Sequence, residues 1–382
     1  AFAEGFLKKT AASLTKTEVD TLALSCFALT CELATRFLAD YIVGDKYFKV
    51  KKPQHNLVRT RCQIALAKDM LNKRDAMHAA TKRPKTHNSF CIQTTRQFCR
   101  VVFKNRGEFI MKILLTGANG FVGARIRATA PVICAPSLRG AEKEDIDRLI
   151  DTVQPDAILH TAAISDIGAC AKDPEGSYHA NVLVPEYLAK AANGAKLVLF
   201  SSDQVYSGAK GDKPFTEDDV ATANLYAEEK LEMENRVLAI DPNAVMLRAT
   251  WMYDMPMFGV PNRSNLITMF LNAAITQKPL ALSKEEFRGI TYVREVAEQT
   301  LQAVNLPGGA YNFGSEADVS MYALAELFMK KTGMKLNLQE KSGGENLWMN
   351  CAKLKNAGGG FETTAEGLAT CMEDYNLSLL GQ

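Results

Sequence analysis

The chain has 382 residues, about two and a half times the ~150 residues of a typical domain, so we expect at least two structural units. Its 47% hydrophobic and 23% charged residues are typical of a globular protein and exclude a disordered or fibrous chain. The net charge of +2 hides an asymmetry, because residues 1–110 hold 20 Lys+Arg against 9 Asp+Glu, whereas residues 111–382 hold 25 against 34.

Three classes of site and segment are not expected. The basic first part lacks the aromatic-interleaved or zinc-finger arrangement of a nucleic-acid-binding segment. Nine cysteines occur without a C-x-x-C pair, which predicts reduced thiols in a cytoplasmic protein rather than disulfides or a metal site. Ser25, Thr30 and Glu32 interrupt the apolar stretch that begins at Thr21, so we expect no membrane insertion. No charged segment followed by an apolar one opens the sequence, so we expect no export signal.

The first part of the chain predicts two helices. Thr15 and Glu18 are spaced as a capping box, and apolar residues then recur at helical period as far as Phe37. A second amphipathic helix is predicted from His55 to about Met77, after a loop over residues 44–48. The string RFLADYIVGDKYFKVKKPQHNLVRTRCQIALAKDM resembles the C-terminal helical end of N-acetylhexosamine kinases, in the choline-kinase and aminoglycoside-phosphotransferase superfamily.

That resemblance covers residues 1–77 and implies a fragment without phosphotransfer activity, since such kinases carry their catalytic and metal-binding Asp residues upstream of it. Residues 78–110 follow neither the helix nor the strand period, so we expect a linker or an unstructured segment. Met111 then opens a sequence that looks like a natural protein start. We hypothesise that the chain joins the end of one gene product to a complete neighbour; whether residues 1–110 belong to the mature protein is left open.

A glycine run follows Met111. The apolar strand from Ile113 to Leu115 directly precedes Gly117-x-x-Gly120-x-x-Gly123 and a predicted helix. Glycines in this register permit a tight turn, let the backbone approach a pyrophosphate, and allow close packing of the helix on the strand. The pattern therefore predicts a nucleotide-binding loop.

Strands and helices alternate in the rest of the chain. Strands are predicted over residues 132–135, 157–160, 196–201 and 244–247, and Asp173 followed by Pro174 indicates a helix start between them. This alternation predicts an α/β fold with a doubly wound parallel sheet of the Rossmann type.

The predicted chemistry lies in the strings LVLFSSDQVYSG and NLYAEEKLEMEN. Tyr226 and Lys230 are four residues apart on a predicted helix, so their side chains lie on one face. We expect Lys230 to lower the pKa of Tyr226 and make the phenol a proton donor near neutral pH. The hydroxyl residue Ser202 ends the preceding strand.

Residues 111–382 resemble the extended short-chain dehydrogenase/reductases, and within them the dTDP-4-dehydrorhamnose reductase (RmlD-like) branch. The strings TGANGFVG, PDAILHTAA, FSSDQVYSG, YAEEK and LRATWMYD carry the resemblance. It implies a Rossmann-type domain with a small C-terminal substrate lobe, preceded here by the all-α fragment. It also implies an NAD(P)H-dependent oxidoreductase that reduces a keto group on a nucleotide-linked sugar, as in dTDP-rhamnose biosynthesis.

The resemblance also assigns residues to roles. Ser202, Tyr226 and Lys230 would be catalytic, and Ser202, Asp203 and Trp251 would contact the substrate. The cofactor would bind at Gly117, Asn119, Gly120, Phe121, Val122, Gly123, Ala162, Ala163, Tyr226 and Lys230. A turn cap is the alternative for Asp203, a core aromatic for Trp251, and packing for Asn181, which matches a family helix Asn. His160 and His179 are interpreted as structural, and no metal site is expected.

Two departures from the family pattern bear on specificity. No acidic residue stands where the adenosine 2′-hydroxyl would be bound; Ser137 and Arg139 stand there instead, which favours NADPH, with NAD as the alternative. The segment FRGITYVREVAE has Ile290 where the family has Pro. The substrate's sugar and nucleotide therefore stay open.

Two other functions are compatible with the same sequence. An epimerase or dehydratase of this fold would retain its nicotinamide, and a non-catalytic NADP-binding regulatory subunit would use the nucleotide lobe as a platform. We expect a nucleotide-sugar substrate and neither nucleic acid nor membrane as a partner; a homodimer is left open.

Overall fold

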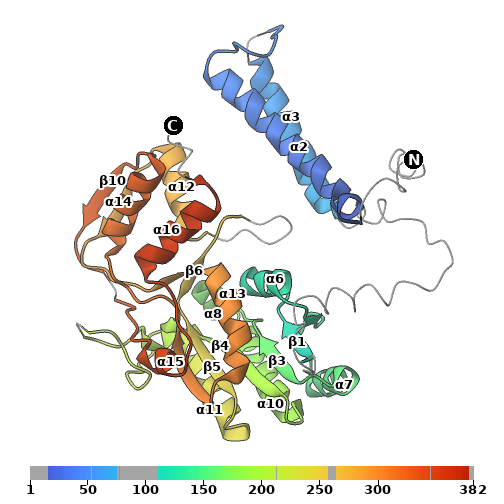
Figure 1. Cartoon of the computed structure of the whole chain (residues 1–382), viewed down its shortest axis with the longest axis vertical. Coiled ribbons are helices and arrows are strands. Elements are labelled where there is room, and N and C mark those ends of the chain that lie inside the picture. The colour runs from blue at the N-terminus through green and yellow to red at the C-terminus, as the bar shows by residue number, and fades with distance from the viewer. Residues whose placement is uncertain are drawn as a thin grey trace, which may run out of the picture. The chain divides into compact units, whose positions relative to one another are not determined.

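The computed structural model describes residues 16–52, 54–74, 77, 111–211, 213–256, 264–344 and 346–377. The chain divides into two units, Ala1–Lys104 and Asn105–Gln382 (Figure 1). The predicted linker over residues 78–110 and the predicted cap at Thr15 lie outside the described residues.

The first unit contains two helices that pack on each other, α2 (Lys16–Ile42) and α3 (His55–Asn72). Asp40, buried near the end of α2, organises the turn between them. Its carboxylate accepts the Tyr47 and Phe48 N–H groups at 2.6 and 2.8 Å and the Asn56 side-chain amide at 2.8 Å. The loop predicted over residues 44–48 is thus confirmed. α3 ends at Asn72, but helical backbone resumes at Arg74 and Met77, and the Met77 N–H donates to the Lys73 carbonyl at 2.9 Å, so the helical segment reaches the predicted end with an interruption at Lys73.

One stretch of α2, Thr21–Ile42, is long and apolar enough to cross a membrane by length and composition alone. The interruptions at Ser25 and Thr30 are accommodated in the helix, because each hydroxyl donates a hydrogen bond to the carbonyl four residues earlier. Core helices of soluble proteins meet the same length and composition. The absence of membrane insertion stays a prediction.

The second unit contains a parallel six-stranded sheet in the order β2-β1-β3-β4-β5-β9. Its strands are β1 (Ile113–Thr116), β2 (Ile133–Cys134), β3 (Ala157–His160), β4 (Lys196–Ser202), β5 (Val245–Ala249) and β9 (Gly309–Phe313). The chain passes from β1 to the edge strand β2 and returns to β3 on the other side, so a crevice opens at the carboxyl ends of β1 and β3. This order confirms the predicted doubly wound fold, which positions a nucleotide site at that edge.

Helices cover both faces of the sheet (Figure 1). One face packs against α7 (Lys143–Val153), α10 (Val184–Ala191) and α11 (Leu225–Ile240), and the other against α6 (Phe121–Thr129) and α13 (Val293–Gln302). The apolar strand residues alternate between two cores, with Leu114 buried on the first face and Leu115 on the second.

Shorter helical segments connect these elements. They are α8 (Ile167–Lys172), α9 (Pro174–Tyr178), the π-helix η1 (His179–Leu183), the 3-10 helices η2 (Asp203–Tyr206) and η3 (Ala303–Asn305), and α15 (Ala352–Asn356). The predicted start at Asp173 and Pro174 is confirmed, because the Asp173 carboxylate accepts the Gly176 N–H at 3.1 Å.

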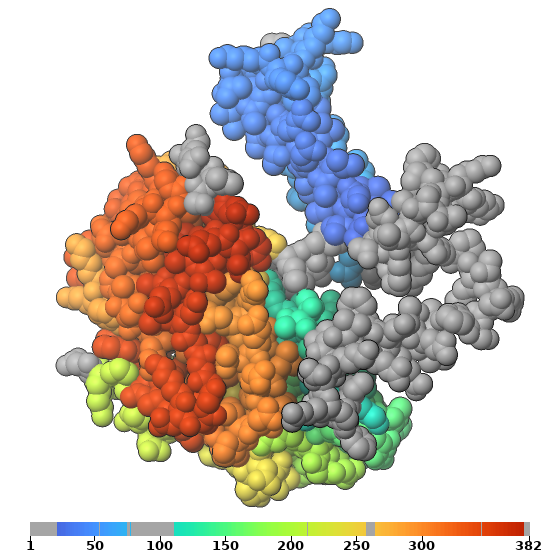
Figure 2. Space-filling view, in the orientation of Figure 1, coloured from blue at the N-terminus to red at the C-terminus, as the bar shows by residue number. Residues whose placement is uncertain are grey.

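A smaller C-terminal lobe packs around its own apolar core. It contains β6 (Trp251–Tyr253), α12 (Leu266–Thr276), β7 (Leu280–Ser283), β8 (Ile290–Tyr292), α14 (Met321–Thr332), β10 (Leu338–Lys341) and α16 (Thr364–Asp374). Strand β6 pairs with β8, and β10 with β7, both in parallel. In the space-filling view this lobe, orange to red, is continuous with the green and yellow residues of the sheet lobe (Figure 2).

Candidate active site

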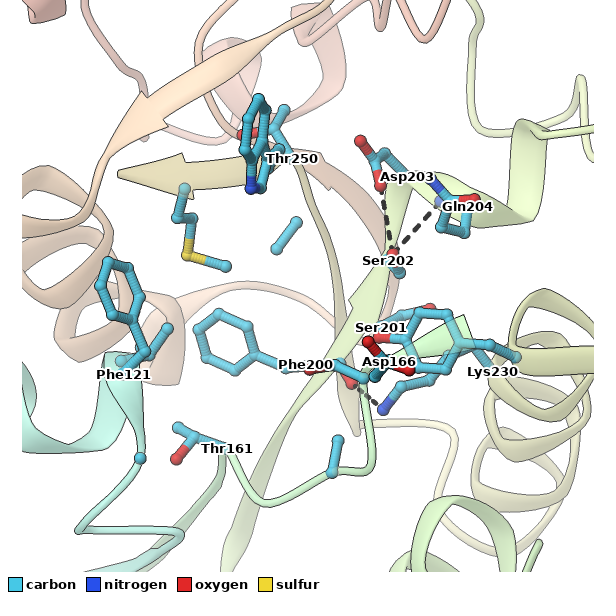
Figure 3. Close-up of a pocket in the computed structure, with 18 of the residues that line it drawn as sticks. Phe121, Thr161, Asp166, Phe200, Ser201, Ser202, Asp203, Gln204, Lys230 and Thr250 are labelled. Atoms are coloured by element: carbon cyan, nitrogen blue, oxygen red, sulfur yellow. Dashed lines mark hydrogen bonds between the residues drawn. The ribbon is translucent and has the colours of Figure 1, made fainter. Parts of the chain in front are cut away.

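A cavity of about 930 Å³ lies at the carboxyl ends of β1, β3, β4 and β5, and both lobes of the second unit line it (Figure 3). Eleven residues predicted for the site line this cavity: Gly117, Gly120, Phe121, Val122, Ala162, Ala163, Ser202, Asp203, Tyr226, Lys230 and Trp251. Positions spread over 135 residues of sequence thus meet in one cavity.

The glycine loop between β1 and α6 has the geometry of a phosphate-binding turn. Gly117 has a φ of +71°, and a side-chain carbon there would lie 2.7 Å from the Ala162 nitrogen. A side-chain carbon at Gly123 would overlap the Gly117 carbonyl oxygen, so this glycine permits α6 to start close to β1. Phe121 and Val122 therefore present the free N-terminus of α6 to the cavity, an arrangement suited to an anionic phosphate.

Tyr226 and Lys230 lie on the first turns of α11, which Asn224 caps by accepting the Ala227 N–H at 3.0 Å. Both side chains are buried, and the Lys230 Nζ lies 5.9 Å from the centroid of the Tyr226 ring. Lys230 donates a hydrogen bond of 2.8 Å to the Phe200 carbonyl on β4 (Figure 3). The predicted common face is confirmed, and it points toward the cavity.

The expected effect of Lys230 on Tyr226 is wrong for this structure. Burial raises the pKa of Tyr226 above its ordinary value, only partly opposed by a hydrogen bond with Ser202. Burial also lowers the pKa of Lys230 to about 8. Both side chains are almost completely desolvated, and the nearby Asp203 and Glu229 further raise the Tyr226 pKa. The phenol is therefore fully protonated at neutral pH.

Ser202 and Asp203 follow one another at the end of β4. The Ser202 hydroxyl donates to Asp203 Oδ1 and accepts the Gln204 N–H, both at 3.2 Å (Figure 3). The residue that caps η2 is thus Ser202, and the turn-cap alternative for Asp203 is wrong. The second Asp203 oxygen lies 3.4 Å from a guanidinium nitrogen of Arg288.

Trp251 opens β6, packs partly buried against the core of the C-terminal lobe, and also lines the cavity. Its ring lies 5.4 Å from the guanidinium carbon of Arg288, within the range of a cation–π contact. The Arg288 guanidinium thus covers one face of the Trp251 ring, on the side of the cavity that the C-terminal lobe forms.

Asn181 anchors the loop that carries Ala162 and Ala163. Its side chain makes two 2.9 Å hydrogen bonds with the backbone of Ile164 and donates at 2.7 Å to the buried Glu229. Asn181 is fully buried and is not among the described residues that line the cavity. The geometry supports the packing alternative: Asn181 connects the loop after β3 to α11.

The structural interpretation of His160 and His179 stays a prediction, because the Nε2 atom of each is buried without a hydrogen-bond partner in the described structure. His160 is buried at the end of β3 with its Nδ1 2.8 Å from the Thr116 hydroxyl, and burial together with the charge of Lys230 lowers its pKa to about 3. His179 lies 3.8 Å from Glu142. Within the described part of the chain no cluster of His, Cys, Asp and Glu could hold a metal, and the seven described cysteines are free.

Four residues predicted for the cofactor do not line the cavity in the described structure. Gly123 lies behind the loop, where it packs on Gly117. Asn119 accepts a hydrogen bond from Arg127 at 3.0 Å. Ser137 and Arg139 are exposed on the chain that follows the edge strand β2, and the Arg139 N–H donates to the Ser137 hydroxyl at 3.4 Å.

Sequence reasoning also missed part of the lining. The additional residues include Thr161, Ser165, Asp166, Phe200, Gln204, Thr250, Met252, Asn265 and Arg288. Several of them adjoin a predicted motif, so extending each motif by a residue would have found them. Arg288 carried a weaker signal, since it lies in the segment FRGITY that departs from the family pattern.

Comparisons with known proteins concern the second unit. The RmlD substrate binding domain family matches residues 111–343. The spore coat polysaccharide biosynthesis protein SpsK of Bacillus subtilis is 25% identical over 233 residues, which cover 58% of this chain and 80% of that protein. The dTDP-4-dehydrorhamnose reductase of Escherichia coli K12 is 28% identical over 252 residues, covering 60% and 82% of the two chains.

Solved structures show the same fold. The dTDP-4-dehydrorhamnose reductase from Bacillus anthracis in complex with NADP is 18% identical, with a TM-score of 0.63, and the match covers 70% of this chain and all of the other. Another solved structure of this fold is a complex with NAD+. At these identities the likeness shows the arrangement of the elements alone.

Proposed function

The chain belongs to the RmlD substrate binding domain family, and on that premise we propose that its second unit is an NAD(P)H-dependent reductase of a keto group on a nucleotide-linked sugar. Several relatives carry the name dTDP-4-dehydrorhamnose reductase, which supports this reaction class. One observation carries the proposal: Ser202, Tyr226 and Lys230 line the same cavity as the glycine loop. A nucleotide-binding platform does not require these three side chains together.

The cavity fits a nicotinamide dinucleotide. The backbone at Gly117 leaves a space that a single side-chain carbon would fill, and the N-terminus of α6 favours a pyrophosphate beside it. Ala162 and Ala163 are small residues beside the place where a ribose would lie. We infer NADP as the cofactor, with NAD as the alternative, and assign the adenosine 2′-phosphate to Ser137 and Arg139.

The cofactor, when bound, supplies the hydride that reduces the keto carbon. The Ser202 hydroxyl turns from Asp203 to donate a hydrogen bond to the carbonyl oxygen as negative charge develops on it, and Tyr226 then transfers its proton to the same oxygen. The raised pKa of Tyr226 suits this role, because the phenol keeps its proton until an alkoxide forms. Lys230, fixed by the Phe200 carbonyl, holds the nicotinamide ribose.

The substrate assignment follows from the other side of the cavity. Trp251 offers an aromatic face, and Asp203 is a buried carboxylate that accepts hydrogen bonds from its neighbours. Both properties suit a sugar, whose hydroxyl groups donate to carboxylates and whose C–H faces pack on aromatic rings. An enzymatic assay must identify which sugar and which nucleotide the substrate contains.

The test is NADPH oxidation by the full chain against a panel of nucleotide-linked keto sugars, dTDP-4-dehydrorhamnose among them. A reductase oxidises one NADPH for each sugar reduced. An epimerase or dehydratase of this fold retains its nicotinamide, so conversion of the sugar without net NADPH oxidation would contradict the proposal. NADPH binding with no conversion of any sugar would indicate a regulatory subunit.

The cofactor assignment has its own test. Since Arg139 is exposed and unpaired with any carboxylate in the described structure, its charge is available to a 2′-phosphate. One charge-assisted contact is worth about 1 to 2 kcal/mol, so NADPH should bind ~10-fold more tightly than NADH, and Arg139→Ala should remove this difference. Arg148→Ala, which removes an exposed arginine paired with Asp145, is the matched control. Equal affinities in the unmodified protein would refute the assignment.

A further inference from the structure

Arg288 of the C-terminal lobe lines the cavity beside the proposed catalytic groups. A guanidinium nitrogen lies 3.4 Å from Asp203, the residue next to Ser202, and the guanidinium carbon lies 5.4 Å from the centroid of the Trp251 ring. The side chain is only 24% exposed. Arg288 therefore brings a positive charge from the substrate lobe to the reacting end of the cavity.

The backbone around Arg288 is fixed. Arg288 pairs with Leu347 in an isolated parallel β-bridge, and the N–H of Phe287 donates to the Asn346 side chain at 2.8 Å. The Phe287 ring stacks on Trp348 with their centroids 5.4 Å apart. At Gly289 a side-chain carbon would overlap the Ser315 carbonyl oxygen, so the chain packs closely here. These contacts fix the backbone from which the Arg288 side chain extends. Less conformational entropy is therefore lost when the side chain binds a ligand.

The hydrogen-bonding capacity of Arg288 is largely unused. A guanidinium carries five N–H donors, and the described structure gives it one acceptor, Asp203, at a long distance. Its Nε is buried and has no partner in the described structure, which is costly for a charged donor. The other cation among the described lining residues, Lys230, already donates to the Phe200 carbonyl.

We propose that Arg288 binds an oxyanion of the substrate, held next to the keto group that Ser202 and Tyr226 act on. This inference rests on the proposed function and assigns Arg288 to a charged group of that substrate. A phosphate of the nucleotide linkage and a carboxylate on the sugar ring both present paired oxygens that a guanidinium binds in bidentate fashion. The contact with Trp251 holds the planar group in place for such a ligand.

An alternative role for Arg288, the orientation of Asp203, is compatible with the same contacts in the structure but predicts a different effect on ligand binding. If Arg288 only orients Asp203, its removal weakens charged and neutral ligands equally. If it binds an oxyanion, its removal weakens the charged ligand alone. Comparing matched ligands with and without the charge therefore separates the two roles.

The experiment measures affinities by calorimetry with the NADP-loaded full chain, and uses two pairs of probes. The first pair is dTDP and thymidine, which tests a phosphate; the second is glucuronate and glucose, which tests a carboxylate. In one of the pairs the anionic probe should bind about 10- to 100-fold more tightly, and Arg288→Gln should bring that ratio close to one while Arg288→Lys retains part of it. NADP affinity should not change.

Arg294→Gln is the matched control, because this exposed arginine pairs with Asp374 and Glu298 and does not line the cavity in the described structure. Ratios near one for both pairs in the unmodified protein would overturn the inference, and that result needs no variant to fold. A ratio that Arg288→Gln leaves intact would also overturn it. Since neither result depends on turnover, the NADPH oxidation assay judges the proposed function separately.

Discussion

Burial shifts the pKa values of Tyr226 and Lys230, the two side chains on α11 that line the cavity. It raises the pKa of Tyr226 and lowers that of Lys230 to about 8, so at neutral pH the phenol is protonated and the amine is mostly charged. Both are the forms that a proton donor and a ribose-binding cation need in a reduction. The spacing of four residues brings the groups to one face, and desolvation shifts their pKa values without changing the charge of either group at neutral pH.

Tyr226→Phe is the direct test of the proton donor. The ring and its packing stay, and the transferable proton is lost, so kcat should fall by about 100- to 10,000-fold while the NADPH affinity changes little. Lys230→Met should reduce both kcat and the NADPH affinity, because it removes the ribose contact as well as the charge. Steady-state kinetics on an identified substrate, with NADPH titration, measures the two effects.

Tyr311→Phe is the control for that variant. Its hydroxyl donates to the Pro307 carbonyl at 3.0 Å, outside the described lining of the cavity, so the rate should stay unchanged. Near-normal turnover by Tyr226→Phe would remove Tyr226 from the mechanism and weaken the case for a reductase.

Glu295 on α13 gives a pH-dependent prediction. Burial raises the pKa of this carboxyl from its ordinary value to about 7, and it accepts the Glu362 N–H at 2.9 Å. Between about pH 4.5 and 7 the folded state therefore holds a proton on Glu295 that the unfolded state has released. Because of this difference, the contribution of Glu295 to the free energy of unfolding falls as the pH rises through that range. Glu295→Gln should remove this slope, as urea unfolding at pH 5 and pH 8 would measure. Glu298→Gln, at a surface ion pair, should leave it unchanged.

At the scale of elements, one buried network holds α11, which carries Tyr226 and Lys230, against the sheet. Arg248 on β5 donates to the Glu234 carboxylate on α11 at 2.7 Å and to the Tyr206 hydroxyl at 2.9 Å. The Tyr206 hydroxyl in turn donates to Asn312 on β9 at 2.6 Å. The Arg248 and Glu234 side chains are only 5% and 3% exposed, so each charge is compensated by the other charge and not by water.

Glu234→Ala should therefore destabilise the second unit by about 3 to 5 kcal/mol, because it leaves the Arg248 charge buried and unpaired. Thermal unfolding followed by circular dichroism measures the loss. Arg236→Ala on the same helix breaks partly exposed ion pairs with Glu186 and Glu232 and should cost less than about 1 kcal/mol. Equal losses from the two variants would contradict the assigned role of the buried pair.

The elements that were predictable are those whose signals are local. The glycine run predicted the turn between β1 and α6, and Asp173 with Pro174 predicted the start of α9. Both structural features depend on backbone geometry within a few residues. The interruption of α3 was less predictable: the helix ends at Asn72, where the Lys73 N–H bonds back to the last turn, and helical backbone resumes at Arg74 and Met77.

At the scale of the whole molecule, the site combines residues that no local pattern connects. Arg288 meets Asp203 only because the C-terminal lobe folds back over the end of β4, 85 residues away in the chain. The direction of the Tyr226 pKa likewise depends on how completely the fold excludes water. Family resemblance supplied the proposed catalytic positions, whereas such long-range contacts required the structure. The cytoplasmic location and the homodimer stay predictions.

The two units differ in how they bury apolar surface. The six strands of the sheet all come from residues 113–313, and the Lys112 N–H closes the start of β1 by donating to Asp156 at 2.6 Å. In the helical unit, large apolar side chains are exposed, among them Leu29 at 64%, Ile42 at 73% and Tyr47 at 74%. Such exposure reduces solubility.

A protein that starts at Met111 should therefore fold cooperatively, bind NADPH with the affinity of the full chain, and be more soluble than it. Unfolding in urea, NADPH titration and the concentration at which each protein aggregates measure the three properties. A protein that starts at Leu115 is the control, because it lacks half of β1, which pairs with both β2 and β3, and should fail to fold. If the Met111 protein loses cooperative unfolding as well, the helices of the first unit contribute to the stability of the second.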